Sequence, residues 1–149
     1  MNCPRCELAL TERAINANKV RHCSNCDGLV VSVRVMNDVM KALVDQLIEQ
    51  GKTIGDVEPC HQPNPVGGPC PDCANTMDNF RYLGKVHLDR CSPCMMLFID
   101  GGQELEDTVR TWAISTKHKL QARENNLSDM EEMGRRMGLV IATQSSGLQ

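Results

Sequence analysis

Cys3-Pro4-Arg5-Cys6 is followed, after sixteen residues, by a second Cys-x2-Cys turn, Cys23-Ser24-Asn25-Cys26. The same arrangement returns as Cys70-Pro71-Asp72-Cys73 and, after seventeen residues, as Cys91-Ser92-Pro93-Cys94. A Cys-x2-Cys turn places two thiolates side by side, and two such turns close a four-sulfur tetrahedral site. The spacing therefore predicts two structural zinc ions, one held by Cys3, Cys6, Cys23 and Cys26 and the other by Cys70, Cys73, Cys91 and Cys94.

The composition makes such a metal staple necessary. The chain has 149 residues, of which only 3% are aromatic, so each half must fold around a small core. Zinc binding to four cysteines contributes on the order of 10–16 kcal/mol at neutral pH, much of it realised as folding free energy. Sulfur ligands also suit iron. Iron sites of this kind usually sit in aromatic-rich cores, however, so zinc is the favoured ion.

Nine cysteines could instead form the disulfide framework of a secreted protein. We favour metal because the N-terminal residues, Met1 to Cys6, lack the apolar core of a signal peptide, and paired Cys-x2-Cys turns are typical of reducing compartments. A cytoplasmic location is therefore expected. The ninth cysteine, Cys60, lies beside His61 in a segment without a further metal pattern, and a free surface thiol is the favoured interpretation.

The two cysteine sets divide the chain into repeated units. The offset is 67 residues from Cys3 to Cys70 and 68 from Cys23 to Cys91, which indicates an internal duplication. We expect a first ribbon plus helix over 1–50, a Pro- and Gly-rich linker over 51–69, a second ribbon over 70–102 and a helical region over 103–149 with a disordered end from Thr143. The predicted fold is a small, metal-stapled α+β protein with two short antiparallel sheets, each followed by an amphipathic helix.

Local patterns place the elements. Apolar residues recur at helical spacing from Val35 to Gln50, and Gly51 can end this helix. Packing on its own ribbon is the favoured fate of that apolar stripe, with the second helix or another chain as alternatives. In the first ribbon a short strand is expected around Val20, and the β-branched run from Asp27 to Val33 suits a third strand. In the second ribbon Val86 and Leu88 alternate after Gly84, and Leu97 to Ile99 is expected to form the third strand.

The sequence pattern of the C-terminal region predicts two further helices. The first runs from near Gln103 to about Glu124, with a break at Asn125-Asn126. A capping box from Ser128 to Glu131 would start the last helix. Its apolar stripe is Met130, Met133, Met137 and Ile141, and Gly134 and Gly138 would allow a second helix to approach. Core or coiled packing is favoured over a partner groove for this stripe.

The second ribbon resembles the bacterial type of the transcription-factor-IIB-like zinc ribbon family. The resemblance is carried by Cys70-Pro71-x-Cys73, Met77, Gly84, Val86, Leu88-Asp89, Cys91-x2-Cys94, Leu97-Phe98-Ile99-Asp100, Gly102 and Glu104-Leu105. The first ribbon is similar but more diverged, with Ser32 in place of Asp100. The second ribbon departs from the family in Met95-Met96, where glycines usually ease the turn. The resemblance implies a ribbon fold and zinc, and it implies little about activity.

A noncatalytic adaptor or scaffold that binds other proteins is the favoured function. Four sulfur ligands leave no open position for water on the metal, and the four histidines are scattered without a catalytic order. The expected partner surfaces are the helical segments 35–50 and 103–141, with a homo-oligomer as one possibility. No run of about 18 apolar residues predicts a membrane span. The chain could still be the soluble part of a membrane protein.

Nucleic-acid binding is the alternative function. Residues 1–34 carry five basic and three acidic side chains, and Arg5, Arg13, Lys19 and Arg21 could contact phosphates. A net charge of −3 for the whole chain and the scarcity of aromatic side chains for base stacking count against it.

Overall fold

The computed structural model describes residues 1–63 and 66–137. The chain divides into two compact units, Met1–Ile114 and Ser115–Gln149. Four features of the sequence analysis lie outside the described residues: Pro65 of the linker, Gly138 and Ile141 of the last helix, and the tail from Thr143, for which disorder was expected.

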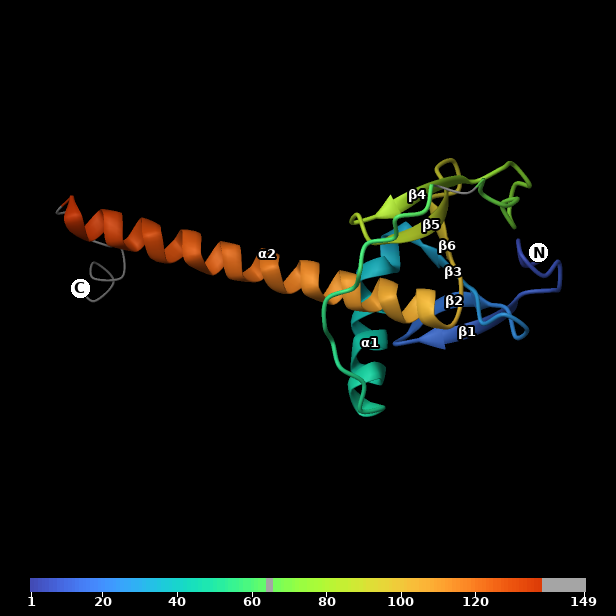
Figure 1. Cartoon of the computed structure of the whole chain (residues 1–149), viewed down its shortest axis with the longest axis horizontal. Helices are drawn as coiled ribbons and strands as arrows, with labels where there is room; N and C mark the ends of the chain where they lie inside the picture. Colours follow the sequence, from blue (N-terminus) through green and yellow to red (C-terminus); the bar gives the residue numbers. More distant parts are fainter. Residues whose placement is uncertain (64–65, 138–149) are drawn as a thin grey trace. The chain divides into compact units, whose positions relative to one another are not determined.

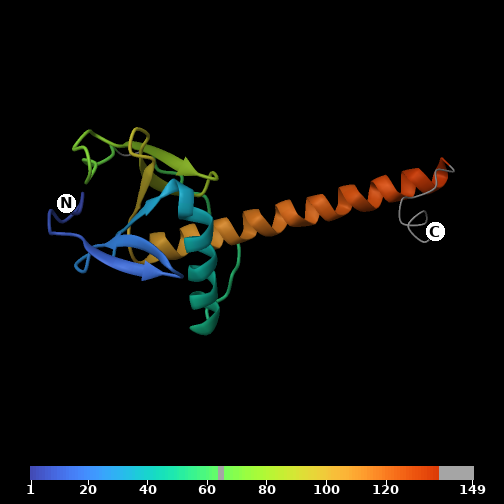
Figure 2. The same ribbon diagram turned by 180° about the vertical axis from the view of Figure 1, so that it is seen from behind.

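The first unit is built on one antiparallel sheet of six strands in the order β1-β2-β3-β6-β5-β4. Figure 1 shows the sheet and its helices, and the view from behind in Figure 2 shows the two hairpins at opposite ends of the sheet. The strands are β1 Thr11–Ile15, β2 Asn18–His22, β3 Leu29–Ser32, β4 Asp78–Tyr82, β5 Val86–Cys91 and β6 Met96–Ile99. A short 3-10 turn, Val33–Val35, leads into α1 Met36–Glu49, and α2 spans Gln103–Arg136.

The two halves meet at the centre of the sheet through a symmetric strand pair. In the ladder between β3 and β6, Val30 lies opposite Phe98, Leu29 opposite Ile99 and Val31 opposite Leu97. A shift of 68 residues carries Val30 onto Phe98 and converts each flanking pair into the other. The halves are therefore related by an approximate two-fold axis at the Val30–Phe98 pair, as in an isologous dimer contained in one chain.

The hairpin turns account for the single residue by which the halves differ. Two residues with positive φ, Asn16 (49°) and Ala17 (69°), join β1 to β2, as a tight turn between twisted strands requires. In the second hairpin Tyr82 pairs with Val86, which leaves a loop of three residues. The offset therefore changes from 67 to 68 at this turn, and the strands on either side keep equivalent registers.

This single sheet differs from the two separate sheets expected from the sequence. Each ribbon alone would leave its third strand at a sheet edge, with unpaired backbone groups and an apolar face on each side. Pairing β3 with β6 satisfies both edges at once. The continuous apolar runs Leu29-Val30-Val31 and Met96-Leu97-Phe98-Ile99 suit strands that are buried on both faces.

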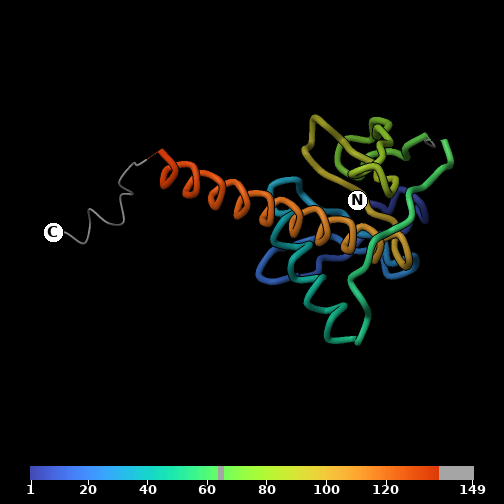
Figure 3. Tube along the Cα trace, turned by 60° about the vertical axis from the view of Figure 1, so that its left-hand side comes forward, coloured from blue at the N-terminus to red at the C-terminus, as the bar shows by residue number. Residues whose placement is uncertain are grey.

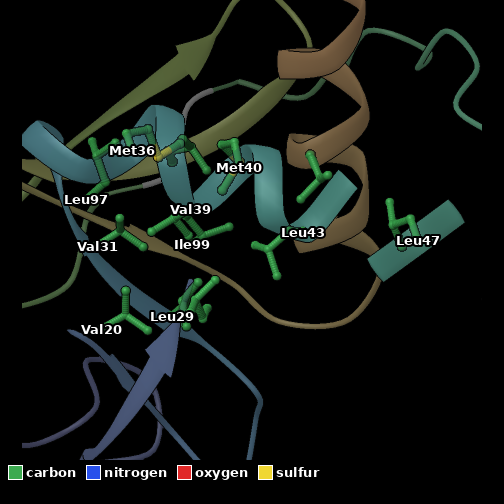
Figure 4. Packing of buried hydrophobic residues seen from close by; sticks show 13 residues of the cluster. Val20, Leu29, Val31, Met36, Val39, Met40, Leu43, Leu47, Leu97 and Ile99 are labelled. Atoms are coloured by element: carbon green, nitrogen blue, oxygen red, sulfur yellow. The ribbon is translucent and has the colours of Figure 1, made fainter. Parts of the chain in front are cut away.

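Helix α1 covers one face of this sheet. Its stripe of Met36, Val39, Met40, Leu43 and Leu47 is buried in a cluster with residues of β2, β3, β5 and β6. Figure 4 shows Met36, Val39 and Met40 of α1 close to Val31, Leu97 and Ile99, with Leu43 and Leu47 farther along the helix. The stripe therefore packs on strands of both halves and not on its own ribbon alone. Gly51, with φ of 76°, follows the end of the helix as expected.

The connection between α1 and β4 runs along the first unit to the hairpin of β4 and β5, as the trace in Figure 3 shows. Of this connection, residues 52–63 and 66–68 contain no helix or strand. The carbonyl oxygen of Thr53 accepts a hydrogen bond from Arg110 Nε at 3.0 Å, and that of Gln62 accepts one from Arg81 Nη2 at 2.9 Å. These bonds attach the connection to α2 and to β4.

The first turns of α2 complete the core. Val109 is buried, Leu105 and Trp112 are partly buried in the cluster that α1 forms with the sheet, and Trp112 Nε1 donates to Asn37 Oδ1 at 3.0 Å. The prediction of a break at Asn125-Asn126 is wrong, because α2 continues through both residues and through Ser128 without a new start. Two asparagines lower helix propensity by only about 0.5 kcal/mol each, and no proline or glycine accompanies them.

Among the described residues, three Arg–Asp ion pairs join the halves, and two of them occupy equivalent places with their charges exchanged. Arg5 Nη2 lies 2.7 Å from Asp89 Oδ2, and Arg21 Nη1 lies 2.7 Å from Asp72 Oδ1. Arg5 and Asp72 occupy the same place in the first turn of each half, and Arg21 and Asp89 both stand two residues before the third cysteine. Like halves would place Arg5 against Arg21 or Asp72 against Asp89. Attraction therefore occurs only between unlike halves.

This exchange predicts a double-mutant cycle with a specific outcome. Arg21→Asp and Asp72→Arg alone each bring like charges together, and each should lower the free energy of unfolding by about 1 kcal/mol. The double variant restores an opposite pair and should recover most of that loss. Thermal unfolding of the metal-loaded protein measures all three. Arg13→Asp, at an exposed position of β1, is the matched control and should change stability by less than about 0.5 kcal/mol. A double variant as unstable as the sum of the singles would contradict this account.

Candidate metal centres

The eight cysteines of the repeated pattern gather into two groups. Within each group the four sulfur atoms all lie within 4.8 Å of one another. We name the group of Cys3, Cys6, Cys23 and Cys26 the first cysteine cluster and the group of Cys70, Cys73, Cys91 and Cys94 the second cysteine cluster. The grouping of ligands expected from the sequence is therefore the one that the fold brings together.

The sulfur–sulfur distances fit a tetrahedral ion. They are 3.7 Å for Cys3–Cys26, 3.9 Å for Cys70–Cys94 and 3.6 Å for Cys73–Cys91. Four sulfurs at about 2.3 Å from one central zinc ion would lie about 3.8 Å apart. A disulfide would need about 2.05 Å, and all nine cysteines, which lie in the described part of the chain, are free thiols. Each cluster can therefore hold one metal ion.

Local backbone geometry shapes the turns that carry these sulfurs. In three of the four turns the first cysteine accepts a backbone hydrogen bond from the residue after the second cysteine, with N···O distances of 2.9 Å to Cys3, 2.8 Å to Cys23 and 2.9 Å to Cys70. The donors Glu7, Asp27 and Ala74 all have positive φ, of 61°, 60° and 65°. A left-handed residue at this place reverses the chain and turns both sulfurs toward the same point.

The fourth turn, Cys91 to Cys94, is followed by Met95-Met96. Met95 has a φ of 53°, but its N–H donates to the carbonyl oxygen of Ser92 at 3.2 Å, whereas the other turns use the carbonyl oxygen of the first cysteine. Cys91 is instead held as the last residue of β5, where it pairs with Met96 of β6. The side chain of Met95 is 44% exposed, so the turn accommodates it without burying it. Met96 is buried beneath the cluster and takes no part in the left-handed geometry.

Hydrogen-bond donors surround the sulfur atoms. The backbone N–H groups of Arg5 and Asp72 each donate to the sulfur two residues earlier at 3.4 Å, and Asn25 Nδ2 donates to Cys6 Sγ at 3.1 Å. Four thiolates around a divalent ion leave a net charge of about −2, which such donors stabilise. The side chain of Asn25 is a contributor that the ligand pattern alone did not indicate.

Proton affinities within the clusters are uneven. The backbone N–H of Cys26 lowers the pKa of Cys23 to about 7, and the backbone N–H of Asn75 lowers the pKa of Cys73. Burial raises the pKa of Cys26 to about 12, and contact with Cys91 followed by burial raises the pKa of Cys94 to about 12. Burial also raises the pKa of Cys3 and of Cys91. At neutral pH each metal-free cluster thus retains at least two thiol protons that a metal ion must displace.

Both clusters rest on one apolar cluster on the sheet face opposite α1. It contains Cys3 and Cys23 of one half, Cys70 and Cys91 of the other, and Val30 and Phe98 from the central strand pair. Arg5 lies over the Phe98 ring at 5.2 Å from its centroid, and its guanidinium also donates to Asp89 and Asp100. Asp89, only 1% exposed, accepts from Asn79 Nδ2 at 2.7 Å as well. Neither metal centre is therefore structurally independent of the other half.

The remaining candidate residues lie outside the clusters. Cys60 is half-buried and its N–H donates to the carbonyl oxygen of Lys85 at 3.0 Å, and neither Cys60 nor His61 belongs to either metal-binding group. His22 Nε2 lies 3.2 Å from Asp27 Oδ1, and His87 Nε2 lies 3.3 Å from the carbonyl oxygen of Gln62.

Of the four basic residues considered for nucleic-acid binding, two are engaged in ion pairs. Arg5 pairs with Asp89 and Asp100, and Arg21 pairs with Asp72. Arg13 and Lys19 are exposed on the hairpin of β1 and β2. The sequence analysis did not predict that Arg5 would pair with Asp89 and Arg21 with Asp72. The equivalence of Arg5 with Asp72 and of Arg21 with Asp89 under the repeat offset was the available signal.

Comparisons with protein-family models, with curated proteins and with solved structures find no match to this chain. The family resemblance therefore rests on the quoted residues alone. Among the described residues, no helix has the length and apolar character needed to cross a membrane.

The number of metal ions per chain should fall when a clustered cysteine is replaced and should stay the same when Cys60 is replaced. Cys73→Ser removes a ligand that no other cysteine can replace, so purified protein should carry one metal ion per chain where the wild type carries two. Cys60→Ser is the matched control and should retain both ions. Elemental analysis by inductively coupled plasma mass spectrometry gives the count. Loss of an ion from the Cys60 variant would contradict the assignment.

Metal affinity should fall steeply with acid. Because at least two raised-pKa thiols in each cluster regain protons on metal release, the apparent dissociation constant should rise by at least about 100-fold per pH unit below neutrality. Competition with a chromophoric chelator at two pH values, corrected for proton binding by the chelator, measures this slope. A slope of one proton or fewer per ion would argue against four-thiolate ligation.

Proposed function

We propose that the chain is a zinc-binding, noncatalytic adaptor of the cytoplasm that binds a protein partner through α2. Zinc is the ion of choice because it takes four thiolates in a tetrahedron, and the sulfur spacing of both cysteine clusters suits that geometry. A four-thiolate site has no open coordination position for substrate or water. The proposed role of the metal is to hold the ribbons together, as in the transcription-factor-IIB-like zinc ribbons that the second half resembles.

The observation that carries the proposal lies on the second unit of the chain. Along residues 115–137, five large apolar side chains are between 53% and 68% exposed, namely Leu120, Leu127, Met130, Met133 and Met137. Exposed apolar residues that recur along a helix are typical of a protein-binding surface. The stripe of α1, the other surface expected from the sequence, is largely buried in the core. We therefore assign partner binding to α2.

Nucleic-acid binding is the less favoured function. With Arg5 and Arg21 engaged by carboxylates, Arg13 and Lys19 are the basic side chains left for phosphate among the four considered. Two cations offer little electrostatic affinity, because each phosphate contact contributes only one released counterion.

Affinity capture from a lysate of the source cells tests the two functions against each other. The metal-loaded full chain is used as bait, with and without nuclease, beside Leu127→Glu/Met130→Glu and Arg13→Glu/Lys19→Glu variants. The adaptor function predicts a protein that is retained after nuclease and lost with the first variant only. Ser128→Glu/Glu132→Gln changes the same helix outside the apolar residues and serves as its control. Loss on nuclease treatment together with loss in the Arg13→Glu/Lys19→Glu variant would move nucleic-acid binding to first place.

A further inference from the structure

We propose that the partner of α2 is a second copy of this chain, and that residues 115–137 of the two copies pair antiparallel. This inference rests on the proposed function, because it names the occupant of the same helix. It is argued from the positions of the apolar residues, from the distribution of charge and from what a helix of this length requires.

The apolar residues follow a heptad seam. The seam consists of six positions whose spacing alternates between three and four residues. Four of them carry exposed apolar side chains, Leu120, Leu127, Met130 and Met137, and the other two are Arg123 and Gly134. A 3.5-residue average spacing is the pattern of helices that pack side by side as a coiled coil. Met133 borders the seam. Within the part of the chain that the structure describes, the four apolar side chains of the seam are exposed. A helix with an exposed apolar face gains little stability from packing, since most helix stability in proteins comes from a buried face.

Charge is separated into blocks along the same segment. Lys117, Lys119 and Arg123 form a basic block, and Glu124, Asp129 and Glu131 form an acidic block directly after it. Glu132 is already paired with Arg135 at 2.8 Å and with Arg136 at 3.3 Å on its own helix. Glu131 also lies near Arg135, whose pKa is raised by its hydrogen bond to Glu132 and further by the charge of Glu131. Among the described residues, no ion pair is formed by the three basic side chains, by Glu124 or by Asp129.

The block order selects the orientation of the second copy. A parallel pair in register would align basic block with basic block and would place Arg123 against Arg123 in the seam. An antiparallel pair aligns Lys117 and Lys119 of one copy with Asp129 and Glu131 of the other. Arg123 then lies opposite Leu127 in the seam instead of opposite a second Arg123. The seam then places Leu120 opposite Met130 of the second copy and Lys117 beside Glu131 of the second copy. The small Gly134 faces Thr116 and allows the helices to approach closely.

Self-association of the purified, zinc-loaded full chain is the first measurement. Sedimentation equilibrium from micromolar concentration to about 1 mM should show a reversible dimer. Leu127→Glu/Met130→Glu should weaken the association at least about tenfold, and Ser128→Glu/Glu132→Gln should leave it near the wild-type value. A wild type that stays monomeric over the whole range overturns the proposal. If such a monomer still captures a lysate protein through Leu127 and Met130, the adaptor function stands and only the identity of the partner is wrong.

Charge-block variants test the complementarity. Lys117→Glu/Lys119→Glu/Arg123→Glu makes both blocks acidic, and Glu124→Lys/Asp129→Lys/Glu131→Lys makes both basic. Each variant alone should associate at least about tenfold more weakly than the wild type, and an equimolar mixture should form a heterodimer. Homodimers of either variant as tight as the wild type would show that the charge blocks do not guide pairing.

Zero-length crosslinking tests the orientation. Carbodiimide joins a lysine to a carboxylate only at contact distance, and Lys119 and Glu131 of one helix are about 18 Å apart along its axis. Crosslinks from Lys117 or Lys119 to Asp129 or Glu131 that join ¹⁴N-labelled to ¹⁵N-labelled chains are therefore expected for the antiparallel pair. Intermolecular crosslinks confined to Lys119–Glu124 would indicate a parallel pair and overturn the proposed orientation.

Discussion

The pairing of β3 with β6 is the constraint on which the first unit depends. It turns two ribbons that would each expose an apolar edge strand into one sheet, with the Val30–Phe98 pair at its centre. One face of that centre receives α1 and the first turns of α2, and the other face carries both cysteine clusters. The cysteine clusters and the helical core therefore lie on opposite faces of the same two central strands, β3 and β6. A change in the pairing register of these strands would displace both.

Metal and charge act on this pairing at different scales. Each four-thiolate site can contribute on the order of 10 kcal/mol to the folding of its ribbon, which suits a chain with few aromatic residues. The two Arg–Asp pairs contribute far less, but they distinguish unlike halves from like halves, which the metal sites cannot do. Arg5 connects the two effects, because it lies in the first cysteine turn while its guanidinium contacts Phe98, Asp89 and Asp100 of the other half.

This division of roles also bears on function. In the first unit the apolar residues of α1 are buried in the core, and each cysteine cluster is made of four sulfurs from one half. In the proposed function, this unit is the platform. The exposed apolar residues with separated charge blocks lie on residues 115–137. The proposed adaptor thus combines a first unit that can bind two metal ions with a helical segment that exposes apolar residues for a partner.

The sequence by itself determined the local features. The Cys-x2-Cys spacing identified all eight sulfurs that cluster, the apolar periodicity located α1, and the repeat offset agrees with the equivalent registers of the two hairpins. Each of these depends on residues close together or on a fixed period. Only the tertiary structure decided that β3 pairs with β6, that Arg5 meets Asp89 and Arg21 meets Asp72, and that α2 continues through Asn125-Asn126. The first two are contacts between residues about 50 to 85 positions apart, and local pattern does not specify which exposed edge or which charge a distant residue will meet. The third is a small propensity cost that the neighbouring helical residues outweigh.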